Sequence, residues 1–354
     1  MTHDDLYMQR CIELAKKGLG NVAPNPMVGC VIVCNNDIIG EGYHKKFGEA
    51  HAEVNAIQSV VNKDLLPHST LYVNLEPCSH FGKTPPCVDL ILKSGIKRVI
   101  IGCVDPYAQV AGKGIARLRN HGCEVVVGVL KQQSLTLNRR FFTFHEKKRP
   151  FVILKWAQTS DGFIDKIRES NATTQPLKIS GTLSQILVHK WRSEEAAIMV
   201  GTTTALSDNP KLNVRLWTGH DPLRIVIDQK LTLPKYLKLF DKAQNTWVIN
   251  EKMNMKDKAI SHVKIPFSIN SMDFDAFILY LHQNDIQSLL VEGGQKLLQS
   301  FLDRGIWDEA RVFIAPTFLG SGVKAPSISA NSTACTQIGA DNLFVFKNAS
   351  NNGV

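Results

Sequence analysis

The first 130 residues alternate between continuous apolar runs and helical patterns of apolar and polar positions. The apolar runs predict strands at 28–33, 70–75, 98–104 and 124–129. Apolar residues at helical spacing predict helices at 5–17, 52–61, 88–93 and 115–121. Strands that alternate with helices are typical of a largely parallel sheet with both faces covered. We therefore expect one α/β domain in this part of the chain.

A second domain follows a basic, aperiodic stretch at 138–150, after which a new apolar run opens at 151. We place the boundary near 147, which gives domains of residues 1–147 and 148–354. In the second domain, strands are predicted at 151–157, 196–201, 223–228, 246–250, 287–292 and 310–315. Helices are predicted at 182–194, 273–283 and 295–303. The tail after Ser329 shows no clear pattern.

Length and composition support this interpretation of two globular domains. The chain has 354 residues, of which 44% are hydrophobic, and single cores stop growing near roughly 250–300 residues. No window approaches the ~18 uncharged apolar residues of a membrane-spanning helix. The acidic start at 1–5 lacks the basic-then-apolar pattern of a signal peptide. Eight cysteines spread over this length fit a reducing compartment, so we expect a cytosolic protein without a disulfide scaffold.

The charge balance leaves the class of ligand open. Lys and Arg number 41 against 32 Asp and Glu, a net charge of +9. Such an excess is compatible with nucleic acid, a membrane surface or small phosphorylated substrates. The basic residues are scattered, apart from Arg139-Arg140 and Lys147-Lys148-Arg149. Because a phosphorylated small molecule needs only a few local cations, the net charge does not decide between these classes.

Candidate metal chemistry lies in the first domain. His51 and Glu53 form an H-x-E pattern at the start of a predicted helix, and Cys78 and Cys87 each follow a proline. One histidine and two thiolates suit Zn²⁺ and leave a fourth position for water, whose pKa zinc lowers to about 7. Glu53 is placed to carry a proton from that water to a leaving group. A purely structural zinc site, or unrelated buried thiols, is the alternative, but it leaves Glu53 without a role.

The second domain carries a weaker signal. No G-x-G-x-x-G pattern follows its first predicted strand, which disfavours a Rossmann dinucleotide site. Gly293-Gly294 closes a predicted strand and opens a predicted helix, where backbone N–H groups can bind a phosphate. Two glycines after a strand more often form a simple turn, so this pattern alone does not establish a cofactor site.

The motifs of both domains together resemble one family. In the first domain they lie at 24–29, 48–53, 75–80, 82–87, 104–106 and 110–114. In the second they lie at 160–162, 201–204, 208–210, 212–215, 224–228 and 291–294. H-x-E with a later P-C resembles zinc deaminases that act on nucleobases, in which two residues separate the cysteines. Here eight residues separate Cys78 from Cys87, and with T-P-P-C this resembles the bifunctional riboflavin-biosynthesis deaminase/reductase family.

This resemblance implies a fold, two activities and two cofactors. The expected fold is α/β throughout, with an N-terminal cytidine-deaminase-like α/β/α domain and a C-terminal dihydrofolate-reductase-like α/β domain. The first expected reaction is the zinc-dependent hydrolytic deamination of a phosphoribosylated diaminopyrimidinone. The second is hydride reduction of the ribosyl side chain to a ribityl chain by NADPH. The expected ligands are therefore Zn²⁺, NADPH and small phosphorylated pyrimidines.

The resemblance also assigns site residues by position. In the deaminase it implies the zinc ligands His51, Cys78 and Cys87, the catalytic Glu53, and substrate contacts from Asn25, His44, Lys83 and Asp105. In the reductase it implies that Ala157, Thr204, Asp208 and Gly294 face the cofactor. It implies that Arg192, Leu212, Arg215 and Glu292 face the substrate. Two arginines suit a substrate with a phosphate group, which guanidinium binds in a bidentate way.

Departures from the family pattern and two alternatives accompany this assignment. Tyr107 stands where the family usually has asparagine, and Lys178-Ile179-Ser180 stands where many relatives have Trp-Ile-Thr. One alternative is a nucleoside or tRNA deaminase with an unrelated C-terminal domain, which the cysteine spacing disfavours. The other is a nucleic-acid-binding module with a structural zinc, which leaves Glu53 and the second domain unexplained. We expect no nucleic-acid or membrane partner, and we expect a homo-oligomer.

Overall fold

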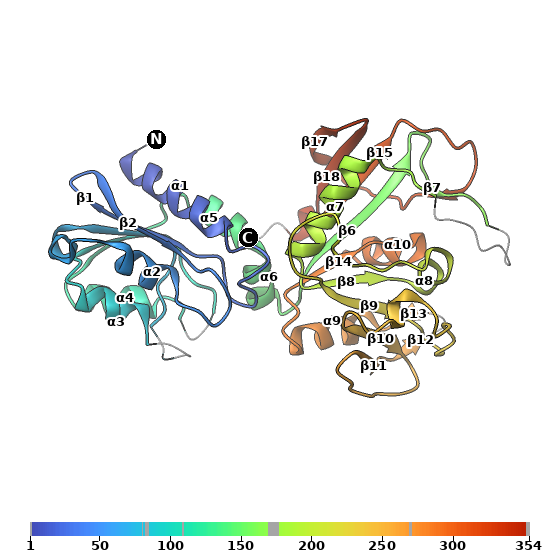
Figure 1. Cartoon of the computed structure of the whole chain (residues 1–354), viewed down its shortest axis with the longest axis horizontal. Helices are drawn as coiled ribbons and strands as arrows, with labels where there is room; N and C mark the ends of the chain where they lie inside the picture. Colours follow the sequence, from blue (N-terminus) through green and yellow to red (C-terminus); the bar gives the residue numbers. More distant parts are fainter. Residues whose placement is uncertain are drawn as a thin grey trace. The chain divides into compact units, whose positions relative to one another are not determined.

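The chain folds into two compact units, Met1–Lys148 (unit 1) and Arg149–Gly353 (unit 2). The computed structural model describes residues 2–79, 81, 85–107, 110–168, 177–268 and 271–351. Each unit has its own sheet and its own hydrophobic cores (Figure 1). Among the described helices, none combines the length and the apolar character that a membrane crossing needs.

Unit 1 is built around a sheet of five strands within its described residues. Its elements are α1 (His3–Lys16), β1 (Gly29–Cys34), β2 (Asp37–Tyr43), α2 (Ala52–Ser59), η1 (Lys63–His68), β3 (Thr70–Leu75), α3 (Cys87–Lys93), β4 (Arg98–Cys103), α4 (Lys113–Asn120), β5 (Glu124–Val127), α5 (Lys131–Leu137) and α6 (Arg139–Lys147). The strand order is β2-β1-β3-β4-β5. Strands β3, β4 and β5 are parallel, as predicted, whereas β1 is antiparallel to both β2 and β3. The expectation of a largely parallel sheet is therefore wrong on the β1 side.

An unpredicted hairpin causes that difference. Asn35 and Asn36 both have positive φ, 52° and 68°, which is the geometry of a two-residue hairpin turn and is favoured by asparagine. The chain therefore reverses directly from β1 into β2. Helices α5 and α6 are also unpredicted. In α6, the adjacent buried side chains of Phe141 and Phe142 interrupt the helical spacing of apolar residues.

Two helical layers cover the sheet of unit 1. Neighbouring residues of a strand point to opposite faces, so Cys30 and Ile32 pack in the core beneath α2, α3 and α4, whereas Val31 and Val33 pack in the core beneath α1. Helix α5 lies beside α1 (Figure 1). On the opposite face, α2 approaches β2 closely, because a Cβ on Gly42 would lie 2.5 Å from the carbonyl oxygen of Ala52. Glycine at this position thus determines how closely the start of α2 approaches the sheet.

Unit 2 is built around a sheet of nine strands within its described residues, in the order β11-β10-β9-β8-β14-β6-β15-β18-β17. Its elements are β6 (Phe151–Thr159), β7 (Phe163–Asp165), α7 (Thr182–Glu194), β8 (Ala197–Val200), α8 (Thr202–Asp208), β9 (Leu223–Ile227), η2 (Lys238–Phe240), β10 (Thr246–Asn250), β11 (Ile260–Lys264), β12 (Phe267–Ser268), β13 (Ser271–Met272), α9 (Phe274–Gln283), β14 (Ser288–Val291), α10 (Gln295–Asp303), β15 (Glu309–Ala315), β16 (Val323–Lys324), β17 (Ser332–Ile338), β18 (Asp341–Lys347) and η3 (Ala349–Asn351). Strands β11 to β15 in this order are parallel, and β18 and β17 add an antiparallel hairpin at one edge. The predicted strands and helices of this half are confirmed.

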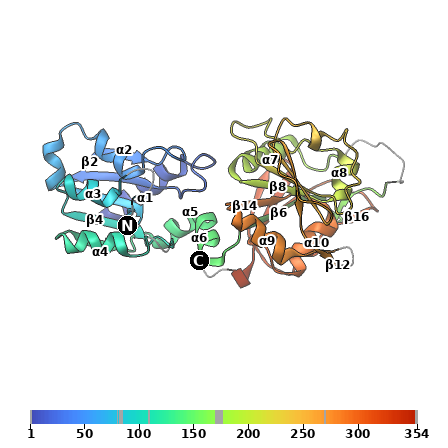
Figure 2. The same cartoon turned by 90° about the horizontal axis from the view of Figure 1, so that it is seen from below.

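Helices cover both faces of the second sheet. Helices α7 and α8 lie on one side of it and α9 and α10 on the other (Figure 2). Along β6, Ile153 packs toward α7, while Val152 and Leu154 pack toward α9 and α10. The hairpin β17–β18 lies in the tail that showed no pattern, because β17 is exposed along nearly its whole length and has no apolar run.

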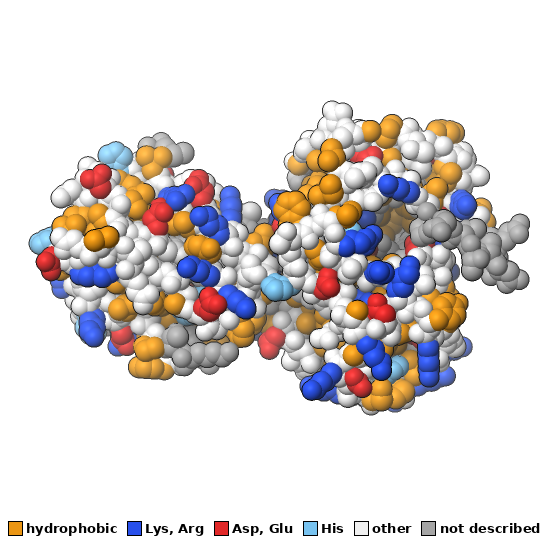
Figure 3. All heavy atoms as spheres, in the orientation of Figure 1, with side chains coloured by type: hydrophobic (Ala, Val, Ile, Leu, Met, Phe, Trp, Pro, Cys, Tyr) orange, Lys and Arg blue, Asp and Glu red, His pale blue; other side chains and the backbone are white. Residues whose placement is uncertain are grey.

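Charged side chains are dispersed over the surface. On the face shown in Figure 3, Lys and Arg side chains lie among acidic, apolar and uncharged ones on both units. They do not gather into one continuous basic stripe on this face. The net charge of +9 is thus spread out in this view rather than concentrated.

Replacement of Gly42 tests the close approach of α2 to β2. In Gly42→Ala, the new Cβ overlaps the backbone of Ala52 and Ala56, so α2 must shift away from β2. We expect the free energy of unfolding of unit 1 to fall by about 1–3 kcal/mol, with weaker metal binding at His51. Urea unfolding followed by circular dichroism and the metal content measure both effects. All five tryptophans lie in unit 2, so unchanged tryptophan fluorescence is the internal control; an undisturbed unit 1 would contradict the prediction.

Candidate active sites

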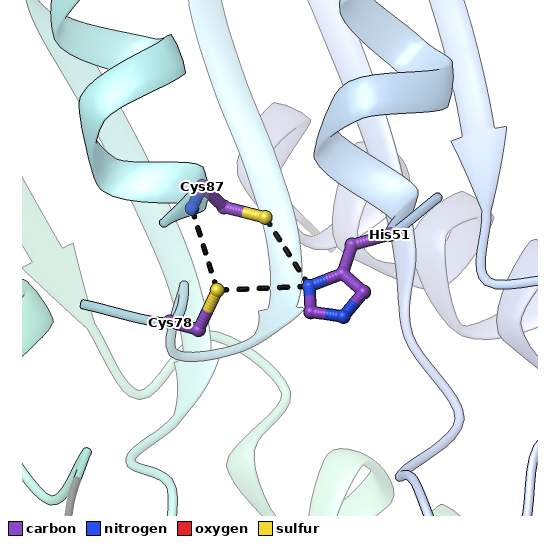
Figure 4. Close-up of side chains that lie close together, drawn as sticks. All are labelled: His51, Cys78 and Cys87. Carbon is purple, nitrogen blue, oxygen red and sulfur yellow. Dashed lines mark hydrogen bonds between the residues drawn. The ribbon is translucent and has the colours of Figure 1, made fainter. Parts of the chain in front are cut away.

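Three metal-ligating side chains of unit 1 converge from separate segments. His51 is the N-cap residue of α2 and makes no capping hydrogen bond with its side chain. Cys78 lies in the loop after β3, and Cys87 is the first residue of α3. Figure 4 shows the three side chains gathered around one point. Cys87 is buried, whereas His51 and Cys78 are half-buried, which leaves one side of the cluster open to ligands.

The spacing of these side chains fits a tetrahedral zinc ion. His51 Nδ1 lies 3.6 Å from Cys78 Sγ and 3.3 Å from Cys87 Sγ. With a Zn–S distance of about 2.3 Å and a Zn–N distance of about 2.0 Å, tetrahedral angles separate nitrogen and sulfur ligands by about 3.5 Å. Within the described residues, the cluster of possible ligands has these three members and no more. Three protein ligands leave a coordination position for water, which is the arrangement of catalytic zinc sites.

Glu53 adds a buried carboxyl group beside this cluster. It lies in the first turn of α2, and only 3% of its surface is exposed. Burial, reinforced by the nearby Cys78, raises the pKa of Glu53 to about 7. A carboxyl group with that pKa can both accept and release a proton at neutral pH. Hydrogen bonds from Cys87 and His51 lower the pKa of Cys78 to about 4, which favours the thiolate that a metal binds.

Asn25 and His44 lie together next to the metal ligand His51. The amide nitrogen of Asn25 lies 3.1 Å from His44 Nε2, and His44 Nδ1 lies 3.1 Å from the carbonyl oxygen of Ala50. Burial lowers the pKa of His44, so the ring is neutral, donates from Nδ1 to Ala50 and accepts from Asn25 at Nε2. The His44 ring meets the His51 ring edge-on, with centroids 5.3 Å apart. Asn25 is thereby tied to the metal cluster through His44.

Asp105 approaches the same region from the neighbouring parallel strand. It follows β4, whose Cys103 pairs with Leu75 of β3. Burial raises the pKa of Asp105 to about 7, and Glu76 and Cys78 add to the rise. The predicted contact Lys83 lies outside the described residues.

Unit 2 contains a cavity of about 440 Å³, which is within the size range of ligand pockets. Its lining includes all four residues predicted to face the cofactor, Ala157, Thr204, Asp208 and Gly294. Gly294 is the N-cap residue of α10, and a Cβ on it would lie 2.9 Å from Thr204 Oγ1. A helix start that only glycine leaves open suits a phosphate group. These residues therefore fit a dinucleotide cofactor.

Glu292 also lines this cavity and is held by Arg192. The guanidinium donates from Nε and Nη2 to the two carboxylate oxygens, each at 2.7 Å, and from Nη1 to the carbonyl oxygen of Asn213 at 3.1 Å. The two side chains are only 7% and 11% exposed. Although burial alone raises it, the pKa of Glu292 is lowered to about 2 by Arg192 and Lys155. Arg192 is therefore occupied by Glu292, which differs from the expectation that it binds a phosphate.

The side chain of Arg215 is exposed, whereas that of Leu212 is buried. Arg215 is exposed, its Nη1 lies 3.3 Å from Asn213 Oδ1, and its backbone N–H donates to His189 Nδ1 at 3.2 Å. Burial and the nearby arginines lower the pKa of His189 to about 4, so its ring is neutral and can accept that bond. The side chain of Leu212 is part of the hydrophobic core, which leaves its backbone for ligand contacts. Neither residue lines the cavity described above.

Comparisons with known proteins decide the family. Residues 1–103 match the model of the cytidine and deoxycytidylate deaminase zinc-binding region, and residues 150–342 match the RibD C-terminal domain. Riboflavin biosynthesis protein RibD of Aquifex aeolicus is 40% identical over 323 residues, which cover 90% of this chain and 89% of that protein. RibD of Escherichia coli is 34% identical over 337 residues, which cover 91% of this chain and 90% of that protein.

The chain belongs to the RibD family. Solved structures agree: a deaminase/reductase of Thermotoga maritima is 38% identical, with a TM-score of 0.85, and the match covers 98% of this chain and 99% of that one. A RibD structure of Acinetobacter baumannii is 31% identical, with a TM-score of 0.86, and the match covers 98% of both chains. The expected fold class, the bifunctional deaminase and reductase of riboflavin biosynthesis, and the cofactors zinc and NADPH are thereby confirmed.

Sequence reasoning missed two polar residues that line the cavity of unit 2. Lys155 lines it from the middle of β6, and burial lowers its pKa. A lysine within an apolar strand was the signal that could have revealed it. Arg168 also lines the cavity and pairs with Asp165 at 2.8 Å and with Asp208 at 3.0 Å. The departing segment Lys178-Ile179-Ser180 is part of the same lining.

Glu76, in the RibD motif that contains Cys78, was also missed. Its buried carboxylate accepts the backbone N–H groups of Asp105, Gly112, Gly114 and Ile115 at 2.9–3.3 Å. It thereby joins the loop with Cys78 to the loop with Asp105 and to the start of α4. Glu76 is part of a motif that the sequence shows, but only the fold shows that its carboxylate binds these four backbone N–H groups.

Removal of Arg192 tests the ion pair in unit 2. Arg192→Met leaves the buried Glu292 charge without its partner, so we expect the free energy of unfolding at pH 7 to fall by roughly 3–5 kcal/mol. Because the folded pKa of Glu292 lies near 2, below its ordinary 4.5, the wild-type stabilisation is present above pH 4.5 and is lost as the pH falls toward 2. The loss caused by Arg192→Met should therefore shrink as the solution is acidified.

Urea unfolding, followed by tryptophan fluorescence at several pH values, measures this change. Arg192→Met combined with Glu292→Gln is the control, since it removes the unpaired charge and should recover most of the stability. Equal loss in the single and the double variant would show that the charge is not the cause.

Proposed function

We propose that residues 1–147 deaminate a phosphoribosylated diaminopyrimidinone and that residues 148–354 then reduce its ribosyl chain to a ribityl chain. The observation that carries the deaminase half is the convergence of His51, Cys78 and Cys87 with the buried Glu53 beside them. The relative from Thermotoga maritima is named a diaminohydroxyphosphoribosylaminopyrimidine deaminase/5-amino-6-(5-phosphoribosylamino)uracil reductase, which supports this choice of substrates.

In the deaminase, Glu53 moves the proton. Zinc, when bound by His51, Cys78 and Cys87, supplies Lewis-acid activation of water. Glu53, with its pKa near 7, takes a proton from the attacking water and delivers it to the departing amino group. The amide nitrogen of Asn25 is bound to His44, which orients its carbonyl oxygen to accept a hydrogen bond from an exocyclic amine.

In the reductase, the residues of the cavity, together with Arg215 outside it, orient two phosphorylated molecules. NADPH supplies the hydride. Gly294 and Thr204 hold the cofactor at the start of α10, and Glu292, kept ionised by Arg192, binds substrate hydroxyl groups. The exposed guanidinium of Arg215 is suited to the substrate phosphate. Lys155 is placed in the cavity to hold or release the proton that accompanies the hydride.

Small-molecule substrates are favoured over nucleic acid. Basic side chains are dispersed on the visible face, whereas nucleic-acid surfaces concentrate them. We therefore propose that the enzyme works without a nucleic-acid or membrane partner, in the cytosol. The homo-oligomer stays a prediction from the pairing of two such domains in one chain.

Product analysis tests the two-step function. The zinc-loaded enzyme is supplied with the phosphoribosylated diaminopyrimidinone, with and without NADPH, and the products are identified by mass spectrometry. We expect deamination in both samples and reduction only with NADPH. Deamination without reduction would overturn the reductase half, and no reaction in either sample would overturn both.

Glu53→Gln separates metal binding from proton transfer. The three ligands remain, so the zinc content should stay unchanged, while deamination falls by about 10²–10⁴-fold because the proton carrier is gone. Reduction of a supplied phosphoribosylamino-uracil should be unaffected. Zinc content by atomic absorption and the rates of the two half-reactions check this outcome; deamination near the wild-type rate would exclude Glu53 from proton transfer.

Gly294→Ala tests the cofactor site. The residue has an ordinary φ of −82°, so alanine is not strained, but its Cβ would lie 2.9 Å from Thr204 Oγ1 and fill the helix start. We expect the KM for NADPH to rise about tenfold, with deamination unchanged. Gly181→Ala is the matched control, because its Cβ meets only an ordinary contact at 3.5 Å. An unchanged KM for Gly294→Ala would place the cofactor phosphates elsewhere.

A further inference from the structure

Two buried asparagines from distant parts of unit 1 bind the backbone of Met27. Asn138, between α5 and α6, accepts the N–H of Met27 at 2.8 Å and donates to its carbonyl oxygen at 2.9 Å. Asn74, in β3, donates to the same carbonyl oxygen at 3.1 Å and accepts the N–H of Gly29 at 2.7 Å. Asn74 and Asn138 are 0% and 2% exposed. Both polar backbone groups of Met27 are thus bound by side-chain amides.

This arrangement needs amide groups. A primary amide presents a donor and an acceptor on one planar group, so Asn138 can pair with Met27 as a neighbouring strand would. An aspartate keeps only the acceptor at neutral pH, and an alanine keeps neither. The segment around Met27 also packs closely against α1, because a Cβ on Gly29 would overlap the backbone of Cys11. The loop before β1 is therefore held from two sides.

The held loop is the one that contains Asn25. Asn25 lies two residues before Met27, and its amide nitrogen lies 3.1 Å from His44 Nε2. The backbone N–H of His44 in turn donates to the carbonyl oxygen of Val28 at 2.9 Å. Asn25 is therefore fixed between the His44 ring at one end and the Met27 backbone at the other. Neither Asn74 nor Asn138 hydrogen-bonds to a metal ligand among the described contacts.

We propose that Asn138, supported by Asn74, is a positioning residue for deamination: it holds the Met27 backbone so that Asn25 meets the pyrimidine in the correct place. This inference rests on the proposed function, since it takes Asn25 as a substrate contact. Small displacements of a positioning group reduce the rate strongly. Asn138 therefore acts on the deaminase reaction through Asn25, at a distance from the metal.

The first test compares three single variants in the full-length, zinc-loaded enzyme. Asn138→Ala should lower the kcat/KM of deamination about tenfold or more, and Asn138→Ser, whose uncharged hydroxyl can still form one hydrogen bond, should lower it less. Zinc content and the reductase rate should stay at wild-type values in both. Asn120→Ala, an exposed asparagine at the end of α4, is the matched control and should change nothing.

The second test is a double-variant cycle with Asn25→Ala. If Asn138 acts through Asn25, adding Asn138→Ala to Asn25→Ala should not lower kcat/KM further. If Asn138 only stabilises the fold, the two effects should multiply, within about twofold, and the proposal would be overturned. Deamination that Asn25→Ala alone leaves intact would instead remove the proposed substrate contact, whatever Asn138 does.

Loss of zinc distinguishes a folding defect from a loss of positioning. If Asn138→Ala loses zinc, the same cycle is run with Asn138→Ser. Loss of zinc in both variants would show that Asn138 maintains the metal site as a whole, which overturns the positioning role.

Discussion

Convergence of three ligand atoms from separate segments is the constraint on which the first half of this enzyme depends. His51 Nδ1 and the two sulfur atoms must meet within a few ångströms, although they come from three separate segments of the chain. Each ligand is therefore placed where the backbone is already fixed: before α2, after β3 and at the first residue of α3. The glycines of β2 support the same convergence from the neighbouring layer, whereas the buried asparagines around Met27 hold the loop that contains Asn25.

Three buried glutamates show how their surroundings decide what a carboxyl group can do. Glu53 has no cationic partner that outweighs burial, and its pKa rises to about 7, as a proton carrier requires. Glu292 meets a bidentate arginine, and its pKa falls to about 2, so it remains a fixed charge. Glu76 accepts four backbone N–H groups and joins two loops of the site. The same type of side chain is thus suited to proton transfer at Glu53, remains a fixed charge at Glu292 and anchors two loops at Glu76.

Both sites form at the carboxyl ends of parallel strands. Cys78 and Asp105 follow β3 and β4 in unit 1, and Glu292 follows β14 in unit 2. In open α/β sheets the loops at these ends lie side by side and helices begin there, so side chains from distant parts of the sequence meet beside free backbone N–H groups. Two unrelated chemistries therefore use the same kind of location.

The chemistry of the metal site could be predicted from the sequence because the residues that carry it are few, of unusual type and each part of a short motif. His51, Glu53 and the two proline-flanked cysteines indicate zinc whatever the rest of the chain does, and regular apolar runs predict most strands and helices. The β1–β2 hairpin, β17 and α6 escaped prediction because their apolar residues are few, interrupted or adjacent. Only the tertiary structure decided which side chains contact one another. Arg192 binds Glu292 rather than remaining free for phosphate, and Leu212 packs in the core. Asn138 binds Met27, which lies 111 positions away in the sequence. The physical reason is that hydrogen bonds and ion pairs form by distance in space, and sequence patterns report only local geometry.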